Sequence, residues 1–272
     1  MCRLLSVSRA AFYRWSEPKE KGADMDMRSA IHEIALEQPW YGYRPMTHAL
    51  RRRGFTVNEK RVRRLMRLDN LVGSKRSLRT YLRAKRHGLP RYENHAAGFV
   101  PTSIDRLWIS DFTYVRLRAA FIFVAVILDA FSRRAIGWAI ASHMRTELTI
   151  EALQMALRRR RPKSGVILHS DGGVQYAALE YGEIMIKNGL IPSMSRPGTP
   201  TDNALCERFM KTLKYEEVLV NEYADIDDAK RSIEHFIEIV YNRKRLHSAL
   251  GYVPPAEFEA NHVKQLTQLI PA

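Results

Sequence analysis

Three carboxylates stand at positions where the sequence otherwise favours apolar residues or turns. Asp111 interrupts the run WISDFTY, Asp171 closely follows an apolar run in LHSDGGVQY, and Glu207 lies early in the helical segment NALCERFMKTLKYE. Each has an ordinary explanation alone, because an Asp before glycines often forms a turn and a helix-surface Glu is usually solvated. Together they offer hard oxygen ligands without an accompanying His and Cys cluster, which favours Mg²⁺ or Mn²⁺ over zinc.

Such a carboxylate set suits phosphoryl transfer. A pair of divalent ions roughly 3.5–4 Å apart can activate a water or hydroxyl and stabilise the leaving oxygen of an in-line displacement. The two glycines after Asp171 leave room for the backbone of a DNA strand. Opposite its apolar side, the helix of Glu207 carries three further polar residues, Asn203, Lys211 and Lys214. The lysines suit phosphates that lie alongside the metal site.

The segments around these carboxylates predict a mixed sheet flanked by helices. Three runs rich in aromatic and β-branched residues, 107–117, 121–128 and 134–141, are typical of an antiparallel meander. They are followed by a helix capped by Thr146, a strand at 166–168, a helix ended by Gly189, a strand at 190–191 and the helix of Glu207. This β-β-β-α-β-α-β-α order is the ribonuclease-H-like one among several topologies for an α/β fold. It makes the first and fourth strands expected neighbours, so that Asp111 and Asp171 approach each other and Glu207 packs across the sheet.

The first third of the chain is predicted to be helical and basic. A helix at 45–53 stops at Gly54, and Asn58 can cap a second helix over 58–69. The outer face of that second helix carries Lys60, Arg61, Arg63, Arg64 and Arg67. Two such helices indicate a helix-turn-helix, although a helical hairpin with a solvated basic face fits the same pattern. Residues 73–100 are interpreted as a basic connector, and an amphipathic helix from Asp225 precedes a basic C-terminal tail.

Charge and composition favour a nucleic-acid partner. The net charge is +15, and residues 1–100 hold 22 lysines and arginines against 9 acidic residues, whereas the remainder is nearly balanced. A basic region of this kind most often binds a polyanion, with ribosomal-type RNA binding or plain solubility as the alternatives. No apolar stretch of about eighteen residues exists, so a membrane-spanning helix is not expected. The two cysteines, Cys2 and Cys206, fit a reducing cytosol.

The motifs around the carboxylates resemble those of a known family. WISDFTY, HSDGGVQY and DNALCERFMKTLKYE are similar to the integrase-type catalytic core of DDE transposases and retroviral integrases. The 35 residues between Asp171 and Glu207 are the spacing that gives this family's motif its name. YGYR at 41–44 and YNRKRLHSALGYVPPAEF further resemble the second-reading-frame transposases of IS-three type bacterial insertion sequences. The zinc-binding His and Cys domain of retroviral integrases is not found in the sequence, which favours the bacterial branch.

The resemblance implies a reaction and a set of site residues. It implies Mg²⁺-dependent (or Mn²⁺-dependent) strand cleavage at the ends of a mobile element and strand transfer by the freed 3′-hydroxyl, without a covalent enzyme–DNA intermediate. Asp111, Asp171 and Glu207 become the ligands of two expected ions, and Lys214 matches the family's basic residue along the DNA. Arg44 and Arg245 lie within the matching motifs and join Lys211, Asn203, Arg61, Arg64 and Arg67 as expected DNA contacts.

The resemblance also implies partners and an organisation of the chain. The expected partners are double-stranded DNA, further copies of the chain, and an upstream-frame protein or fusion that supplies end recognition, because SVSRAAFYRW resembles the start of a second frame and no zipper heptads are visible. The expected location is the bacterial cytoplasm, on the nucleoid. The predicted parts are a helix-turn-helix region (1–72), a basic linker (73–100), a catalytic core (101–220) and a C-terminal helix with a basic tail (221–272).

Two other functions fit the same residues. The chain could be a non-catalytic DNA-binding regulator derived from a transposase, although all three carboxylate motifs are intact. It could also be a ribonuclease-H-type nuclease that hydrolyses without joining, although the basic first third favours recombination. The sequence assigns no role to His169, Gln175 or His247.

Overall fold

The structure is a computed structural model and describes residues 22–71, 91–117, 120–196 and 199–268. The chain divides into two compact units, Met1–Lys75 and Arg76–Ala272, which are described separately below. Most of the predicted basic connector, residues 73–90, lies outside the described residues. None of the described helices is long and apolar enough to cross a membrane.

The N-terminal unit is a small helical unit with one apolar core. Its helices are α2 (Gly22–Glu37), α3 (Tyr43–Arg52) and α4 (Glu59–Leu68). The predicted helix pair is confirmed: Gly54 adopts a φ of 89° after α3, and the Asn58 side chain accepts a hydrogen bond from the N–H of Arg61 at the start of α4. Helix α3 begins two residues earlier than predicted, because Pro45 is tolerated in a first helical turn. Helix α2 was not predicted, and its Met27, Ile31 and Ile34 are buried.

The second unit contains a five-stranded sheet with the order β3-β2-β1-β4-β5. The first three strands pair antiparallel, and β4 pairs parallel with both β1 and β5. The predicted ribonuclease-H-like fold, with its meander and the adjacency of the first and fourth strands, is therefore confirmed. The elements in chain order are β1 (Leu107–Arg116), β2 (Phe121–Asp129), β3 (Ala135–Ala141), α5 (Thr146–Arg160), β4 (Ile167–Ser170), α6 (Leu179–Lys187), β5 (Ile191–Met194), the 3₁₀ turn η1 (Pro200–Asn203), α7 (Ala204–Leu213), the π-helical η2 (Lys214–Val218), α8 (Ile226–His235), the π-helical η3 (Phe236–Lys244), the 3₁₀ turn η4 (Ser248–Leu250) and α9 (Pro255–Gln268).

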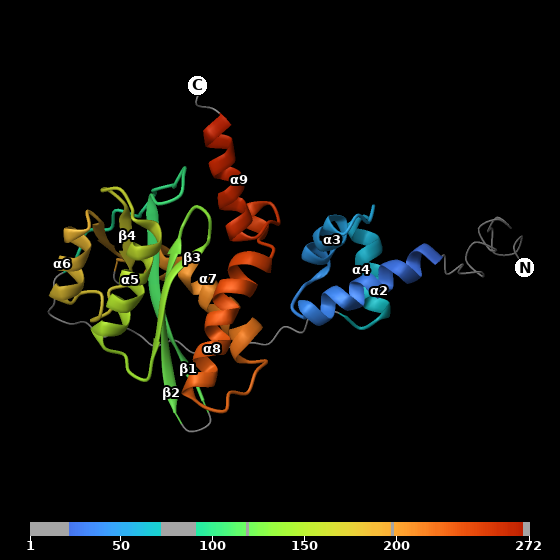
Figure 1. The fold of residues 1–272 in the computed structure, drawn as a ribbon, viewed down its shortest axis with the longest axis horizontal. Coiled ribbons are helices and arrows are strands. Elements are labelled where there is room, and N and C mark those ends of the chain that lie inside the picture. The colour runs from blue at the N-terminus through green and yellow to red at the C-terminus, as the bar shows by residue number, and fades with distance from the viewer. Residues whose placement is uncertain (1–21, 72–90, 118–119, 197–198, 269–272) are drawn as a thin grey trace, which may run out of the picture. The chain divides into compact units, whose positions relative to one another are not determined.

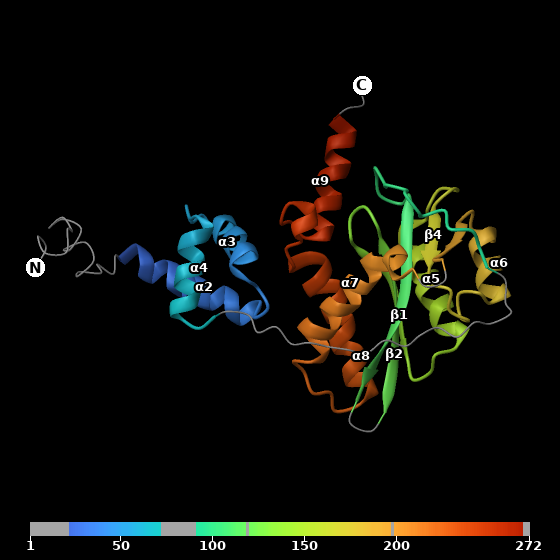
Figure 2. The same cartoon turned by 180° about the vertical axis from the view of Figure 1, so that it is seen from behind.

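Two helical layers cover the sheet on opposite faces (Figures 1 and 2). On one face, α5 and α6 bury a cluster that includes Trp108, Ile127 and Leu168. On the other face, α7, α8 and η3 bury a cluster that includes Ile109 and Phe209. Alternate residues of β1 therefore face different helical layers, which places the side chain of a residue with the parity of Ile109 toward α7.

Several predicted boundaries differ from the structure. Strand β4 extends to Ser170 and strand β5 extends to Met194. Both are longer than predicted because residues 169–170 of β4 continue to pair with β1 and with β5. Thr146 does not cap α5: Arg145 precedes the helix, and no side chain caps it. The predicted amphipathic helix from Asp225 is present as α8, and the Asp225 side chain caps it by accepting a hydrogen bond from the N–H of Asp228.

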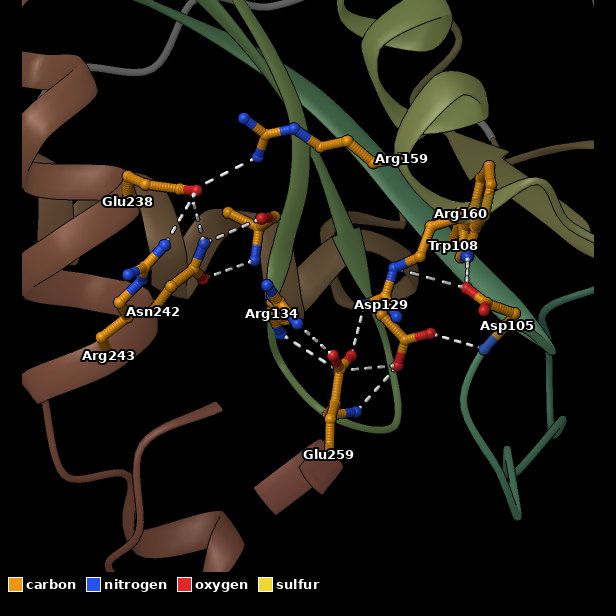
Figure 3. A network of polar contacts seen from close by, with 12 residues as sticks. Asp105, Trp108, Asp129, Arg134, Arg159, Arg160, Glu238, Asn242, Arg243 and Glu259 are labelled. Atoms are coloured by element: carbon orange, nitrogen blue, oxygen red, sulfur yellow. Dashed lines mark hydrogen bonds and ion pairs between the residues drawn. The ribbon is translucent and has the colours of Figure 1, made fainter. Parts of the chain in front are cut away.

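Residues 255–268, within the predicted basic C-terminal tail, form helix α9. Its Glu259 is buried and accepts hydrogen bonds from Ser132 Oγ at 2.7 Å and Arg134 Nη1 at 2.6 Å, and it also pairs with Arg160 (Figure 3). Asp129 extends this network by accepting bonds from the backbone N–H groups of Ser132 and Asp105. Buried, mutually compensating charges thus fix α9 to the core, which local sequence periodicity could not reveal.

Candidate active site

Strands β1 and β4 bring Asp111 and Asp171 together. The last register pair of these parallel strands is Ser110 with Ser170, and each serine is followed directly by one of the two aspartates. Asp111 has the same parity along β1 as Ile109, so its side chain belongs to the face covered by α7. The predicted approach of Asp111 and Asp171 therefore has its basis in the strand register.

Helix α7 carries Glu207 to the same part of β1. Asn203 Nδ2 donates to the carbonyl of Ser110 at 3.3 Å, and Cys206 Sγ donates to the carbonyl of Ile109, also at 3.3 Å. These two contacts fix the start of α7 over the backbone just before Asp111. Glu207 follows Cys206 directly, so the third carboxylate reaches the site on a helix that is anchored by its neighbours.

The carboxylates share one electrostatic environment. Burial, and then the charges of Asp171 and Glu207, raise the pKa of Asp111 to about 8. A hydrogen bond from the N–H of Phe112 at 2.8 Å and the charge of Lys214 act in the opposite direction. The site therefore concentrates negative charge around a partly buried carboxyl, which is what a cation would compensate.

The donor set fits a hard divalent cation in chemistry and in charge. All three groups are carboxylates, and the pKa of Asp111 is raised first by burial and then by the charges of Asp171 and Glu207, which a bound cation would offset. Within the parts of the chain that the structure describes, no three His, Cys, Asp or Glu side chains are arranged to share one metal ion. The three carboxylates therefore lie in one region of the fold, but their side chains are not close enough together to coordinate a single ion.

The turn after β4 gives Asp171 a second role. Its Oδ1 accepts a hydrogen bond from the N–H of Gly173 at 3.0 Å, so Asp171 does begin a tight turn. A Cβ at Gly173 would lie 2.9 Å from the same oxygen, which explains the glycine there. A turn and a ligand role are compatible, because an ionised carboxylate offers about four lone-pair sites across its two oxygens.

The other polar residues of HSDGGVQY hold this turn in place. His169 is buried between Ser193 Oγ at 2.9 Å and Ser195 Oγ at 3.0 Å, and burial lowers its pKa to about 4. Gln175 Nε2 donates to the carbonyl of Met144 at 2.9 Å. The hydroxyl of the buried Tyr176 accepts a bond from Ser110 Oγ at 3.1 Å. These residues connect the turn to β5, to the segment before α5 and to β1.

The expected DNA contacts on α7 and at its two ends, Asn203, Lys211 and Lys214, lie in three environments. Asn203 is 6% exposed and holds the backbone of β1, so its prediction as a surface contact was wrong. Lys211 is exposed and lines a groove of about 450 Å³ together with Glu207, Arg208 and Tyr215. Lys214 Nζ lies 4.9 Å from the ring centre of Tyr114 on β1, and burial lowers its pKa while Asp111 raises it.

Arg245 is engaged inside the molecule. Its guanidinium donates to both carboxylate oxygens of Glu216, at 2.7 and 2.8 Å, and the Glu216 side chain is only 7% exposed. This bidentate pair joins the end of η3 to η2. The structure therefore gives Arg245 a bracing contact, and the sequence offered no signal for a partner 29 residues away.

His247 is also a packing residue. It is buried with its ring edge-on to Tyr241, at a centroid distance of 4.8 Å, and burial and the neighbouring Arg245 lower its pKa to about 3. Its Nε2 is buried without a hydrogen-bond partner in the described parts of the chain.

Some of the predicted DNA-binding arginines of the N-terminal unit form ion pairs within the unit, whereas others are exposed to solvent. Arg61 pairs closely with Asp24 on α2, and Arg64 reaches the other oxygen of the same carboxylate at 3.2 Å. Arg44 lies 3.9 Å from Glu59 and 5.5 Å from the ring centre of Tyr43. Arg67 is exposed at the end of α4. The outer face of α4 therefore combines residues that hold α2 with residues that face solvent.

Comparisons with known proteins agree with this geometry. Two family models described as integrase core domain match residues 101–200 and 188–255, and a model described as an HTH-like domain matches residues 23–77. The chain is 35% identical over 269 residues to an uncharacterized 31 kDa protein of insertion element IS600 from Shigella sonnei, covering 96% of this chain and 98% of that one. It is 32% identical over 266 residues to transposase InsF for insertion sequence IS3A from Escherichia coli K12, covering 95% and 92%.

A solved structure shares the fold. A chain in the cryoEM structure of the simian T-cell lymphotropic virus intasome with PP2A regulatory subunit B56 gamma superposes with a TM-score of 0.51 at 16% identity. The match covers 85% of this chain and 74% of that chain.

Proposed function

Because this chain belongs to the integrase core domain family of insertion-sequence transposases, we propose that it is the subunit that cuts and joins DNA at the ends of its element. The observation that carries the proposal is the convergence of Asp111, Asp171 and Glu207 on one electrostatic site built by β1, β4 and α7. Its substrate is double-stranded DNA, which also places the protein with the bacterial nucleoid.

The proposed reaction consists of two phosphodiester exchanges. In cleavage, a water oxygen bonds to phosphorus, the bond from phosphorus to the 3′-oxygen breaks, and that oxygen takes up a proton to become a 3′-hydroxyl. In joining, this hydroxyl loses its proton and bonds to a phosphorus of the target, whose own 3′-oxygen leaves and is protonated. The joining step conserves the number of phosphodiester bonds and therefore needs no external energy source.

The proposed roles follow from the position of each side chain. Asp111, Asp171 and Glu207 hold Mg²⁺ or Mn²⁺, with two ions as the expected number. Bound ions of this kind lower the cost of the charge that develops on the attacking and leaving oxygens. Lys214, held over Tyr114 beside Asp111, and the exposed Lys211 contact phosphates of the bound strand.

The N-terminal unit contributes DNA binding in this proposal. Its HTH-like helices present Arg67, and in part Arg64 and Arg44, to a phosphate backbone. We assign residues 1–72 to this role, residues 101–220 to catalysis, and the remaining segments to connecting and bracing. The active complex contains further copies of the chain, and an upstream-frame protein or fusion supplies recognition of the element ends.

A cleavage-and-joining assay tests the proposal. The chain is incubated with Mg²⁺ and a labelled duplex that ends in the inverted repeats flanking its gene, and Glu207→Gln is compared with the wild type. We expect the wild type to give both a cleaved strand and a joined product, and the variant to lose both while it still binds DNA. Cleavage without joining would instead indicate a nuclease, and full activity of Glu207→Gln would remove Glu207 from the site.

A further inference from the structure

Residues 91–97 form a segment that is bound to the catalytic unit along β5. The N–H of His95 donates to Ser193 Oγ at 2.9 Å, the N–H of Met194 donates to the carbonyl of Glu93 at 3.4 Å, and Asn94 Nδ2 donates to Asp202 at 2.8 Å. These contacts place the segment beside β5 and beside η1, which leads into α7. The segment lies between the ranges matched by the HTH-like and integrase core models.

Glycines of the catalytic unit make room for this segment. Gly182 lies inside α6, where a side chain would collide with the hydroxyl of Tyr92. Gly172 directly follows Asp171, and a Cβ there would lie 2.7 Å from Nη2 of Arg91 and 3.2 Å from its Cζ. The guanidinium of Arg91 therefore covers the backbone immediately after the second carboxylate of the site.

Arg91 is held in this position while its side chain stays exposed. Its Nη2 donates to the carbonyl of Ser195 at 3.0 Å, and the residue is exposed to solvent. A guanidinium has five N–H donors, so the bond to Ser195 leaves donors for a further acceptor. An arginine fixed by one backbone carbonyl loses little additional freedom when it binds an oxyanion.

The charge balance of the site indicates what that acceptor is. Lys214 lies on the β1 side of the carboxylates, over Tyr114, whereas Arg91 lies on the β5 side, next to Ser195. A DNA strand that places one phosphate among the three carboxylates must place its neighbouring phosphates on either side. Each of those phosphates is an anion near a site that is already acidic, and a fixed cation on each side offsets the repulsion.

We propose that Arg91 binds a DNA phosphate adjacent to the cleaved bond, on the β5 side of the site. This inference rests on the proposed function, since it assumes that DNA is cut at the carboxylates. It makes Arg91, which lies within the predicted basic connector (residues 73–100), a part of the active site. The acceptor is a phosphodiester oxygen, which the planar guanidinium can contact through two parallel hydrogen bonds.

The experiment replaces single phosphates on either side of the cleaved bond by neutral methylphosphonates. The full chain is assayed with Mg²⁺ on the duplex with the flanking inverted repeats, as wild type, Arg91→Ala, Arg91→Lys and Asn94→Ala. We expect Arg91→Ala to slow single-turnover cleavage of the unmodified duplex roughly tenfold to a hundredfold, because a charged hydrogen bond is lost. We also expect the wild type to be slowed by one particular methylphosphonate to which Arg91→Ala is insensitive, with Arg91→Lys in between.

The variants separate a phosphate contact from a bracing role. Asn94→Ala loosens the same segment from Asp202 but keeps the guanidinium, so it should keep the wild-type methylphosphonate profile. An unchanged profile in Arg91→Ala, or full reproduction of the Arg91→Ala profile by Asn94→Ala, would overturn the contact while leaving the proposed function intact. Absence of cleavage by the wild type would instead overturn the proposed function and, with it, the contact.

Discussion

Ser110 and Ser170 face each other as the last register pair of β1 and β4, and each directly precedes a carboxylate of the site. Because neighbouring parallel strands are fixed by their hydrogen bonds, the backbones of Asp111 and Asp171 are held side by side before any ion binds. Burial and then the neighbouring charge of Asp171 raise the pKa of Asp111. Holding two carboxylates side by side therefore lowers the stability of the folded protein, and the same arrangement is what a metal site needs.

The first prediction concerns Asp111→Asn. Loss of one carboxylate should reduce cleavage by roughly a thousandfold or more, because several kcal/mol of charge stabilisation are lost. The same change should stabilise the metal-free protein at pH 8 by on the order of a few kcal/mol, since an amide has no charged form for burial and Asp171 to disfavour. Single-turnover cleavage and urea unfolding, with and without Mg²⁺, measure both effects.

A matched control is Asp227→Asn, because Asp227 is exposed on α8. It should change neither cleavage nor stability by more than a small amount. A metal-free Asp111→Asn protein that is less stable than the wild type would contradict the electrostatic account of the site.

The second prediction concerns Asn203→Ala. The side chain holds the carbonyl of Ser110 and with it the start of α7, so its loss should displace Glu207 and reduce cleavage by about 10–100-fold. DNA affinity and the slope of its salt dependence should stay as in the wild type, because the Asn203 side chain is buried against the backbone of β1 rather than presented to a phosphate. If Asn203→Ala reduced the slope of the salt dependence of DNA binding, Asn203 would be a DNA contact after all.

The case of Asn203 shows where sequence periodicity stops. Its spacing from Glu207 places it on the same helical face only if the helix already includes residue 203. In the structure, residues Pro200–Asn203 form the 3₁₀ turn η1, and Asn203 has a φ of −118°, so the angular count does not apply to it. The angular count holds for Lys211, which lies on α7 and lines the same groove as Glu207, but it fails for Asn203, which precedes the helix.

The antiparallel meander and the candidate carboxylates at its edge could be read from the sequence because their signals are local. Asp111 interrupts an apolar strand and Asp171 ends one, and both signals lie within a few residues of sequence. The partners of Arg245 and Glu259 are distant in sequence, and no pattern near either residue indicates them. Gly182, inside a predicted helix, was the one local sign of the close approach of Tyr92.

The third prediction concerns the outer face of α4. Arg67→Ala should weaken DNA binding and lower the slope of its salt dependence by about 1, as expected for one lost phosphate contact. Arg61→Ala should instead destabilise the N-terminal unit, because Arg61 pairs with the Asp24 carboxylate of α2. Fluorescence anisotropy at several salt concentrations and thermal unfolding separate the two. If Arg67→Ala and the wild type showed the same salt dependence of DNA binding, the outer face of α4 would face solvent and would not contact DNA.

The fourth prediction concerns Glu259, which fixes α9 to the core. Burial raises the pKa of Glu259, but Arg160, Ser132 and Arg134 outweigh burial and hold it below its usual value. Glu259→Ala leaves the Arg160 guanidinium, whose side chain is 12% exposed, without its main partner. Breaking a buried pair in this way should lower the free energy of unfolding by about 3–5 kcal/mol. Gln265→Ala, on the exposed part of the same helix, is the control and should have little effect.

The last prediction concerns acid stability and His247. Burial and the nearby Arg245 and Arg133 keep the folded-state pKa of His247 near 3, below the ordinary value of 6.5. The unfolded chain therefore binds a proton that the folded chain does not bind, and stability is lost as the pH falls below about 6.5. Between pH 7 and pH 5 the wild type should lose about 2 kcal/mol more than His247→Phe, which keeps an aromatic ring against Tyr241 but cannot take up a proton.

Urea unfolding at the two pH values measures this difference. His235→Gln provides the control, because His235 is exposed at the end of α8 and its replacement should leave the wild-type acid sensitivity unchanged. If His247→Phe lost as much stability as the wild type between pH 7 and pH 5, proton uptake at His247 could not be the cause. The acid sensitivity would then have to come from other buried groups, of which His169 has the same sign.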